Sequence, residues 1–301
     1  MDGMELRHLR YFLAIVSTKS FTRAADQLGI AQPTLSQQIR QLEGIAGAPL
    51  FDRLGRSVAL TSTGEALVPH AQDTLRAADA AVQSLNESTD LLSGRMSIAS
   101  FPSLGPFILP AMVKFFNRFP KVHITHQELT TFDLYKAIQS GEAELGFGVN
   151  SAIPNGITAQ ELFKENLVLA LGAANSLAKQ TMVSAKDLAG LPFVEFGYER
   201  LTHNSINKFF ERNSVTPRYC MKAPSISALL QVISATDMVG LVPESYSVMQ
   251  HDKLHFHKLD RPPSRAIAML YLAKATASVA SREFRNTIAT EAKRMKASKR
   301  R

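Results

Sequence analysis

Residues 33–42 carry two kinds of side chain that alternate with the period of an α-helix. Leu35, Ile39 and Leu42 are spaced four and three residues apart, which places them on one buried face. The opposite face of the same helix would carry Pro33, Ser36, Gln37 and Arg40. Glutamine and arginine form paired hydrogen bonds with base edges in the major groove of DNA, and serine donates or accepts. The spacing therefore favours a helix that reads DNA, with the polar face of an ordinary amphipathic helix as the alternative.

Short helices and a turn must position this face. A stripe over residues 6–16 predicts the first helix, and Ser20 can cap a second helix that ends near Gly29. Pro33 suits the first position of the third helix, which should stop near Gly47. A tight turn after Gly29 joins the last two helices, so the order predicts a helix-turn-helix.

Residues 50–60 read as two short strands around a turn at Gly55. Arg53 and Arg56 lie on this hairpin, where they would reach phosphates or a minor groove. Two basic side chains beside the polar helix indicate a DNA-binding wing.

Residues 62–92 are expected to form one long helix. Ser62 and Glu65 have the spacing of a capping box, and Pro69 should bend the helix. From Leu75 to Leu92, mainly apolar residues alternate at spacings of three and four, as in a coiled coil. This stripe favours dimerisation, and a helix packed on its own domain is the alternative.

From Gly94 the pattern changes to alternating strands and helices. This order predicts a parallel sheet with helices on both faces. A similar series begins near residue 165, so two α/β halves should enclose a cleft. Ligands in such folds bind where strands end and helices begin.

Hydroxyl and aromatic side chains occupy the predicted turns at this cleft. Because helix N-termini attract negative charge, these turns would suit an anionic effector. For each Ser or Thr, a plain helix cap is the alternative. The candidate effector-binding residues are Ser100, Ser103, Thr131, Phe196, Thr202 and His203.

The chain has 301 residues and a formal net charge of +8, which suits a polyanionic partner but does not locate it. Residues 1–60 hold seven Lys or Arg and five Asp or Glu, a net of only +2. The last nine residues carry six basic side chains and no acidic one, and we expect a solvated end there, with an auxiliary nonspecific phosphate contact as the alternative. No apolar run is long enough for a membrane span, and the first ten residues do not resemble a secretory signal. These features predict a cytoplasmic protein.

Residues 4–67 resemble the winged helix-turn-helix of LysR-type transcriptional regulators. The resemblance rests on the segments LRHLRYF (6–12), SFTRAADQL (20–28), QPTLSQQIRQLE (32–43), PLFDR (49–53) and LTSTG (60–64). It implies a mixed α/β chain with a winged helix-turn-helix, a linker helix and a two-lobed effector domain similar to periplasmic binding proteins. The implied boundaries are 1–61, 62–92 and 93–301, with lobe I at 93–163 and 266–301 and lobe II at 164–265.

The resemblance also implies roles for single residues. Gln32, Pro33, Ser36 and Gln37 match base-reading positions, and Arg53 matches a wing contact. Many relatives carry arginine where this chain has Gln37, so adenine could be preferred over guanine. The candidate DNA-binding residues are Gln32, Pro33, Thr34, Ser36, Gln37, Arg40, Arg53 and Arg56. Within the family, residues 225–230 and 240–243 resemble the cyanate-responsive branch over a short stretch.

The implied partners are double-stranded promoter DNA, a small-molecule effector and further copies of the chain. Dimers would form through the linker helix, pair into tetramers and bend the promoter, and RNA polymerase is a further candidate partner. The resemblance implies no catalysed reaction, no cofactor and no metal.

Two other classes of protein remain open. An enzyme on the two-lobed fold would need a catalytic constellation, and the sequence holds no P-loop, no nucleophile elbow and no dinucleotide-binding fingerprint. A solute-binding protein would need an export signal. His251, His255 and His257 lack the other ligands of a metal site, and the single cysteine, Cys220, reads as an inert core residue.

Overall fold

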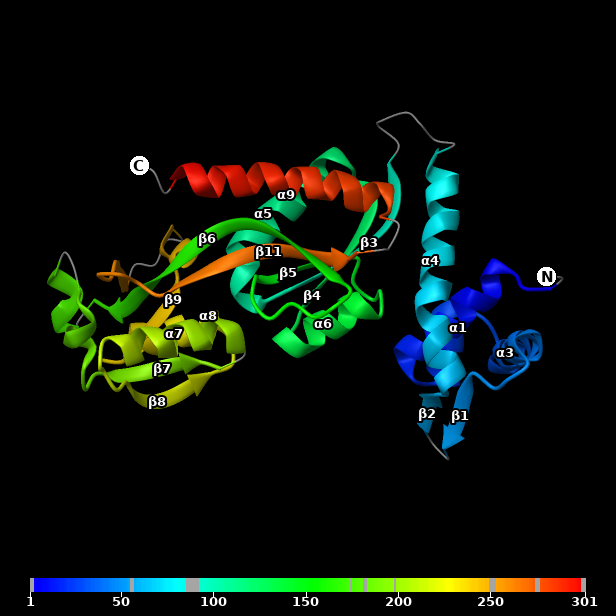
Figure 1. Ribbon diagram of the computed structural model, residues 1–301, viewed down its shortest axis with the longest axis horizontal. Helices are drawn as coiled ribbons and strands as arrows, with labels where there is room; N and C mark the ends of the chain where they lie inside the picture. Colours follow the sequence, from blue (N-terminus) through cyan, green and yellow to red (C-terminus); the bar gives the residue numbers. More distant parts are fainter. Residues whose placement is uncertain are drawn as a thin grey trace. The chain divides into compact units, whose positions relative to one another are not determined.

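The computed structural model describes residues 3–54, 57–84, 92–173, 175–180, 183–197, 199–248, 253–273 and 277–298. The chain divides after Gly94 into two compact units (Figure 1). No helix in these ranges is both long and apolar enough to cross a membrane.

The N-terminal unit is the predicted helix-turn-helix with a hairpin. Leu9, Phe12, Ile15, Leu35 and Ile39 form its core and are all buried. Its elements are α1 (Leu6–Thr18), α2 (Phe21–Leu28), α3 (Gln32–Ala46), β1 (Phe51–Leu54), β2 (Ser57–Leu60) and α4 (Ser62–Ser84).

The helix ends of this unit follow the predicted signals, with two corrections. The Ser20 side chain accepts a hydrogen bond from the Arg23 amide, and Gly29 and Gly47 end their helices with φ of 68° and 70°. α3 begins at Gln32, one residue before the predicted start. The cap of α4 is Thr61 and not the predicted Ser62, because the Thr61 hydroxyl accepts from the Gly64 amide and also donates to the Pro49 carbonyl.

The linker helix is shorter than expected within the described residues. α4 ends at Ser84, and Leu92 lies outside any helix, just before the next strand. Residues 85–91, which carry part of the predicted stripe, lie outside the described ranges. Leu75 packs against the N-terminal core, whereas Val82 is 61% exposed.

The C-terminal domain alternates strands and helices in two lobes. Lobe I contains β3 (Ser93–Ser100), α5 (Gly105–Arg118), β4 (Lys121–Glu128), α6 (Thr131–Gln139), β5 (Leu145–Val149) and α9 (Val279–Ser298). Lobe II contains β7 (Pro192–Phe196), α7 (Arg200–Arg212), β8 (Arg218–Ala223), α8 (Ile226–Ala235), β9 (Val239–Pro243) and β10 (Leu254–His257). Two strands serve both lobes: β6 (Ile157–Gly172) and β11 (Ser264–Leu272). Short 3₁₀ helices span Pro102–Leu104, Ser176–Lys179, Ala185–Leu188 and Glu244–Val248.

The strands follow the order β4-β3-β5-β11-β6-β9-β7-β8, and β10 also pairs with β6. The β3–β5, β7–β8 and β7–β9 pairs are parallel, as predicted. The prediction of a parallel sheet is wrong for β6 and β11, which run antiparallel to each other and to their other partners. A strand that is buried on both faces shows the same continuous apolar sequence whether it runs parallel or antiparallel to its neighbours. The sequence therefore did not predict the direction of β6 and β11.

In lobe I, β5 separates two layers of helices (Figure 1). A Cβ on Gly146 would lie 2.4 Å from Cδ1 of Ile138 on α6, so α6 packs directly against the strand backbone. On the other face, Phe147 meets Phe284 of α9 edge to face at 6.3 Å. The predicted helices on both faces of the sheet are confirmed here.

In lobe II, β6 alternates between two hydrophobic clusters. Leu169 and Leu171 pack with Phe209 and Phe210 of α7. Val168 and Ala170 pack on the other side, among the apolar residues of α8. This period-2 pattern holds α7 and α8 on opposite faces of the lobe II strands.

Candidate DNA-binding surface and interlobe site

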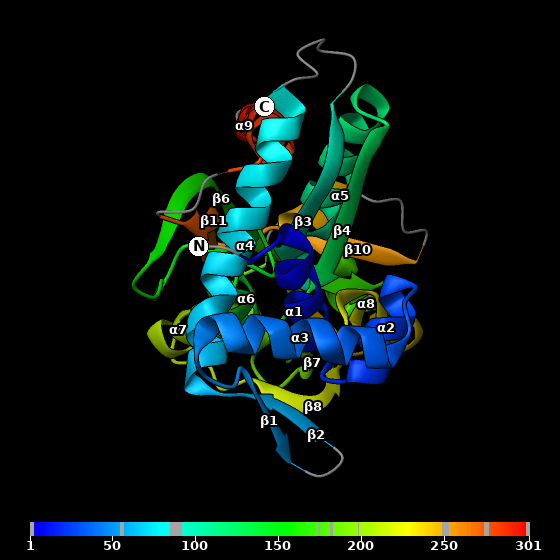
Figure 2. The same cartoon turned by 90° about the vertical axis from the view of Figure 1, so that its right-hand side faces the viewer.

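The α3 helix presents the predicted polar face to solvent. Leu35, Ile39 and Leu42 are 0%, 0% and 2% exposed, so the apolar stripe is buried as expected. Figure 2 looks onto α3, with the β1–β2 hairpin beside it. The exposed or half-buried residues of this face are Gln32, Pro33, Thr34, Ser36, Gln37 and Arg40.

Three hydrogen bonds order this surface. Gln32 Nε2 donates to Ser36 Oγ at 2.9 Å, which links two of the predicted base-reading residues. His8, which is fully buried, accepts from the Glu5 amide through Nδ1 at 3.0 Å. Its Nε2 therefore carries the proton and donates to Gln38 Oε1 at 3.1 Å, which ties the start of α1 to α3.

The wing is fixed by pairing and by one carboxylate. β1 and β2 are antiparallel, with Arg53 opposite Val58. Glu43 Oε1 on α3 accepts from the Leu50 amide at 2.9 Å and so anchors the start of the hairpin. Arg56 lies outside the described residues.

In lobe I, the predicted effector residues Ser100 and Thr131 lie at strand and helix ends. Ser100 is fully buried, and its Oγ is hydrogen-bonded to His126 Nε2 at 2.8 Å. Burial lowers the pKa of His126. Thr130 is the cap of α6, so Thr131 is not used as a cap, and its buried Oγ1 has no hydrogen-bond partner among the described residues.

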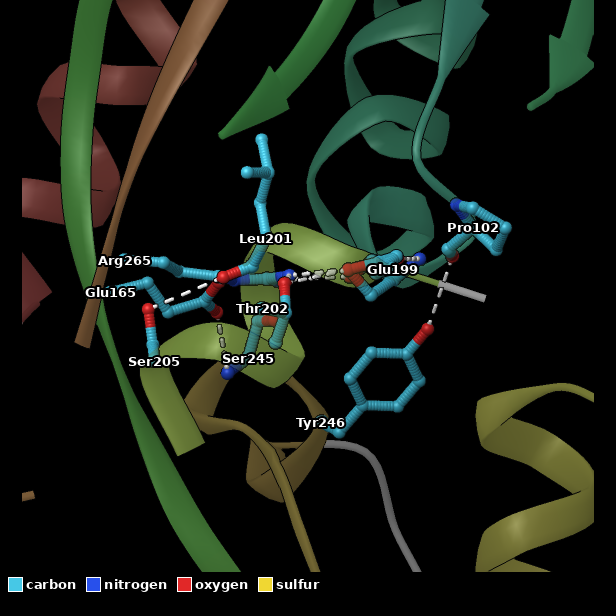
Figure 3. A network of polar contacts seen from close by, with 10 residues as sticks. Pro102, Glu165, Glu199, Leu201, Thr202, Ser205, Ser245, Tyr246 and Arg265 are labelled. Carbon is cyan, nitrogen blue, oxygen red and sulfur yellow. Dashed lines mark hydrogen bonds and ion pairs between the residues drawn. The ribbon is translucent and has the colours of Figure 1, made fainter. Parts of the chain in front are cut away.

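The other pair, Ser103 and Thr202, belongs to a buried ionic network. Figure 3 shows Thr202 in this network with Glu165, Glu199 and Arg265. Its centre is Arg265 on β11, which lies directly opposite Glu165 on β6. Arg265 Nη2 and Nε donate to Glu165 Oε2 at 2.8 and 3.2 Å. Arg265 Nη1 donates to Glu199 Oε2 at 3.0 Å and also to the Ser103 hydroxyl.

Glu199, at the start of α7, joins the two lobes within this network. Its Oε1 accepts from the Ser103 amide at 2.7 Å, and its Oε2 accepts from Ser103 Oγ at 2.6 Å and Thr202 Oγ1 at 2.9 Å. A second link between the lobes is the Tyr246 hydroxyl, which donates to the Pro102 carbonyl at 3.5 Å. The lobes are therefore connected by buried polar contacts from several elements.

Burial and the neighbouring charges shift the pKa values of groups in this network. Burial alone would lower the pKa of Arg265, but the Glu165 and Glu199 carboxylates outweigh it and raise that pKa. Burial, together with the Glu199 carboxylate, raises the pKa of Tyr246. The guanidinium is therefore charged, and it is held between two carboxylates.

The remaining predicted residues, Phe196 and His203, lie in lobe II. Phe196 packs against the lobe II cluster that contains α8. His203 Nδ1 is 3.2 Å from Glu195 Oε1, and its ring lies 6.2 Å from that of Tyr219. Burial and then the Glu195 carboxylate raise the pKa of Tyr219 to about 12.

The sequence assigns no functional role to Cys220 or to the histidine pair His255 and His257. Cys220 is exposed on β8, so the prediction of a core residue is wrong; β8 pairs with β7 at the end of the sheet order, where a strand presents one edge to solvent. His255 and His257 stack at 6.3 Å, as expected for one strand face. The described residues contain no group of three His, Cys, Asp or Glu side chains that could hold a metal.

Sequence reasoning missed Glu165, Glu199 and Arg265. Arg265 gave a signal, because a charged residue beside an apolar strand pattern needs a buried partner. The identity of its partners gave none, because they lie 100 and 66 residues away along the chain.

Comparison with known proteins agrees with this architecture. The family model for the bacterial regulatory helix-turn-helix protein of the lysR family matches residues 6–65. The model for the LysR substrate binding domain matches residues 89–293.

Individual relatives match over most of the chain. The uncharacterized HTH-type transcriptional regulator YnfL of Escherichia coli is 30% identical and covers 84% of this chain and 87% of its own. The Hca operon transcriptional activator HcaR of the same species is 32% identical, covering 80% and 82%. A full-length OxyR variant from Pseudomonas aeruginosa has the same fold, with a TM-score of 0.76 at 19% identity over 97% of this chain and 96% of that one. The chain belongs to the LysR family of DNA-binding transcriptional regulators.

Proposed function

We propose that α3 and the hairpin bind promoter DNA through Gln32, Pro33, Thr34, Ser36, Gln37, Arg40, Arg53 and Arg56. The observation that carries this proposal is the division of α3 into a fully buried apolar stripe and an exposed hydrogen-bonding face. A helix of this kind enters a major groove with its N-terminal residues at base edges, and the hairpin contacts the backbone.

Gln37→Ala should weaken binding to the chain's own operator by about 1–3 kcal/mol, because a paired contact to a base edge is lost. Binding is measured by gel shift on operator and on random DNA of equal length. Gln27→Ala, which removes an exposed glutamine from α2, is the matched control and should bind both DNAs normally. Equal losses on operator and random DNA would exclude base reading by Gln37.

We infer that a small anionic effector binds between the lobes and modulates promoter binding and bending. The proposed contacts are Ser100, Ser103, Thr131, Phe196, Thr202 and His203. Thr131 supports this proposal best, because its buried hydroxyl has no hydrogen bond to any residue that the structure describes. Binding would change promoter geometry by favouring one arrangement of the assembled chains.

The double substitution Ser100→Val with Thr131→Val should abolish the effector response and leave DNA affinity unchanged, because both hydroxyls are lost and neither residue belongs to the helix-turn-helix. A thermal-shift screen of small carboxylates, aromatic acids and inorganic anions identifies the ligand for this assay. Gel shifts with and without that ligand then measure the response. A response that survives in the double variant would place the pocket elsewhere.

We further propose dimers through the linker segment 62–92, which contains α4, and pairing of dimers into tetramers. Support comes from Val82, which is exposed on α4 within a single chain. RNA polymerase is the proposed partner at the promoter, the proposed location is the cytoplasm, and no reaction is proposed. The proposed domain limits remain 1–61, 62–92 and 93–301.

A further inference from the structure

The buried network contains a complete binding site for one carboxylate. Its donors are the Ser103 amide, the Ser103 hydroxyl, the Thr202 hydroxyl and Arg265 Nη1. Ser103 belongs to lobe I, Thr202 to lobe II, and Arg265 to a strand that both lobes share. A site assembled in this way exists only when the lobes are together.

The occupant of this site is the chain's own Glu199. Its carboxylate is 0% exposed and accepts a hydrogen bond from each of the four donors. Oε1 accepts one of these hydrogen bonds and Oε2 accepts the other three, so both carboxylate oxygens are engaged. Two of the predicted effector contacts, Ser103 and Thr202, are therefore already engaged by a protein anion.

Electrostatic repulsion opposes the binding of a second anion beside the Glu199 carboxylate. One guanidinium, from Arg265, faces two carboxylates, from Glu165 and Glu199. The field of Glu199 extends further, because burial and then Glu199 raise the pKa of Glu128. Adding another carboxylate would place like charges together in a desolvated site, which is costly.

We propose that Glu199 is a built-in ligand of the interlobe site, and that a small carboxylate reaches Ser103, Thr202 and Arg265 only by displacing it. The part of this inference that concerns the effector rests on the proposed function. Because Glu199 is tethered, its effective concentration is high, and a displacing molecule needs contacts beyond its carboxylate. The effector class is therefore a carboxylate that carries a second hydrogen-bonding or apolar group.

Removing the built-in ligand should create an acetate site. Glu199→Ala leaves all four donors in place, so acetate can occupy them. In thermal unfolding of the full chain, acetate at ten times its Kd should raise the Tm of this variant by about 3–6 °C over chloride at equal ionic strength. Wild type should not respond, because Glu199 occupies the site. Glu211→Ala should not respond either, because it removes the same charge from an exposed position of α7.

Glu199→Gln is the second variant, because the loss of a buried carboxylate can impair folding. The neutral amide keeps the shape of the side chain but leaves Arg265 with one carboxylate fewer, so acetate should displace it more readily than it displaces Glu199. The expected affinity for acetate lies between those of wild type and Glu199→Ala. If the alanine variant does not fold, the glutamine variant alone decides the question.

Two results would overturn the proposal: a folded Glu199 variant without an acetate-specific gain, or a wild-type chain that gains as much as the variant. Neither measurement uses DNA, so the proposed function is tested separately. If wild type responds to an anion at the promoter but the variants gain no acetate site, the built-in ligand is disproved and effector control stands. If the variants bind acetate but no anion changes promoter binding, the built-in ligand stands and effector control by anions fails.

Discussion

Arg265 is a single buried guanidinium shared by two carboxylates, and both its side chain and theirs are almost fully excluded from water. Such a group stabilises the fold only while every partner is present, because an unpaired buried charge is strongly unfavourable. The arginine fork also matters, since Nε and Nη2 donate to Glu165 while Nη1 donates to Glu199.

Arg265→Met should lower the free energy of unfolding by about 3–5 kcal/mol, because Glu165 and Glu199 lose their common partner. Urea denaturation of the full chain measures the change. Arg265→Lys is the matched control: it keeps the charge but not the fork, so its loss should be smaller. A methionine variant as stable as wild type would show that the network adds nothing to stability.

The sequence predicted the structural position of some residues but not of others. The faces of α3 follow from spacing alone, because helical period and apolar content are local properties. The Glu165–Arg265 pair depends on the register of two strands, and a shift of one strand by one residue would place the two side chains on opposite faces of the sheet. The Glu199 contacts depend on how two lobes close, which no local pattern encodes.

Among the elements, β5 shows why glycine is needed in a strand interior. Gly146 and Gly148 leave room for α6, and a Cβ on Gly148 would lie 3.1 Å from Leu134 Cδ2. The alternating sequence Leu-Gly-Phe-Gly-Val therefore packs a helix closely on one face and aromatic rings on the other.

Gly146→Ala should destabilise the domain by about 1–3 kcal/mol, because the new methyl group overlaps Ile138 Cδ1. Ile138→Val removes that carbon, so the double variant should recover part of the loss. A double-mutant cycle in urea measures the coupling between the two sites. Additive effects would mean that α6 moves away freely and that the close packing is not required.

The sequence predicted most helices and strands but not the direction of every strand. The order of strands and helices followed from apolar periods, whereas the direction of β6 and β11 depends on the chain crossing between lobes. The cap of α4 moved from Ser62 to Thr61, because Thr61 has a tertiary partner, the Pro49 carbonyl, that the local pattern does not show.

At the scale of the whole molecule, net charge and DNA recognition are separate properties. The chain carries +8, but the first 60 residues carry only +2, and most of the excess lies in the last nine residues. Recognition is therefore attributed to the pattern of α3 and the wing, and overall charge would add only a nonspecific contribution.

The stability of the molecule should depend on pH through His126. Burial places its folded pKa below the ordinary value of 6.5, so the unfolded chain takes up a proton first as the pH falls. The contribution of His126 to stability is fully present above about pH 6.5 and decreases as the pH falls from 6.5 towards the folded pKa.

His126→Gln, which can still bond Ser100, should therefore lose less stability than wild type between pH 7.5 and pH 5.5, as measured by urea denaturation. A residual slope should remain from His257, whose pKa is lowered by burial and then by His255. Identical pH dependence in both proteins would show that His126 is not responsible.

β6 is a 16-residue strand whose first half pairs with β11 and whose second half pairs with β9 and β10. Lobe I is also discontinuous along the chain, since α9 returns to it after lobe II is complete. Neither lobe is therefore an independent folding unit. Because both lobes share β6, loss of the strand pairing in one lobe also destabilises the end of the pairing in the other. The two-lobed domain should fold and unfold as one cooperative unit, with the lobes as parts of it and not as separable modules.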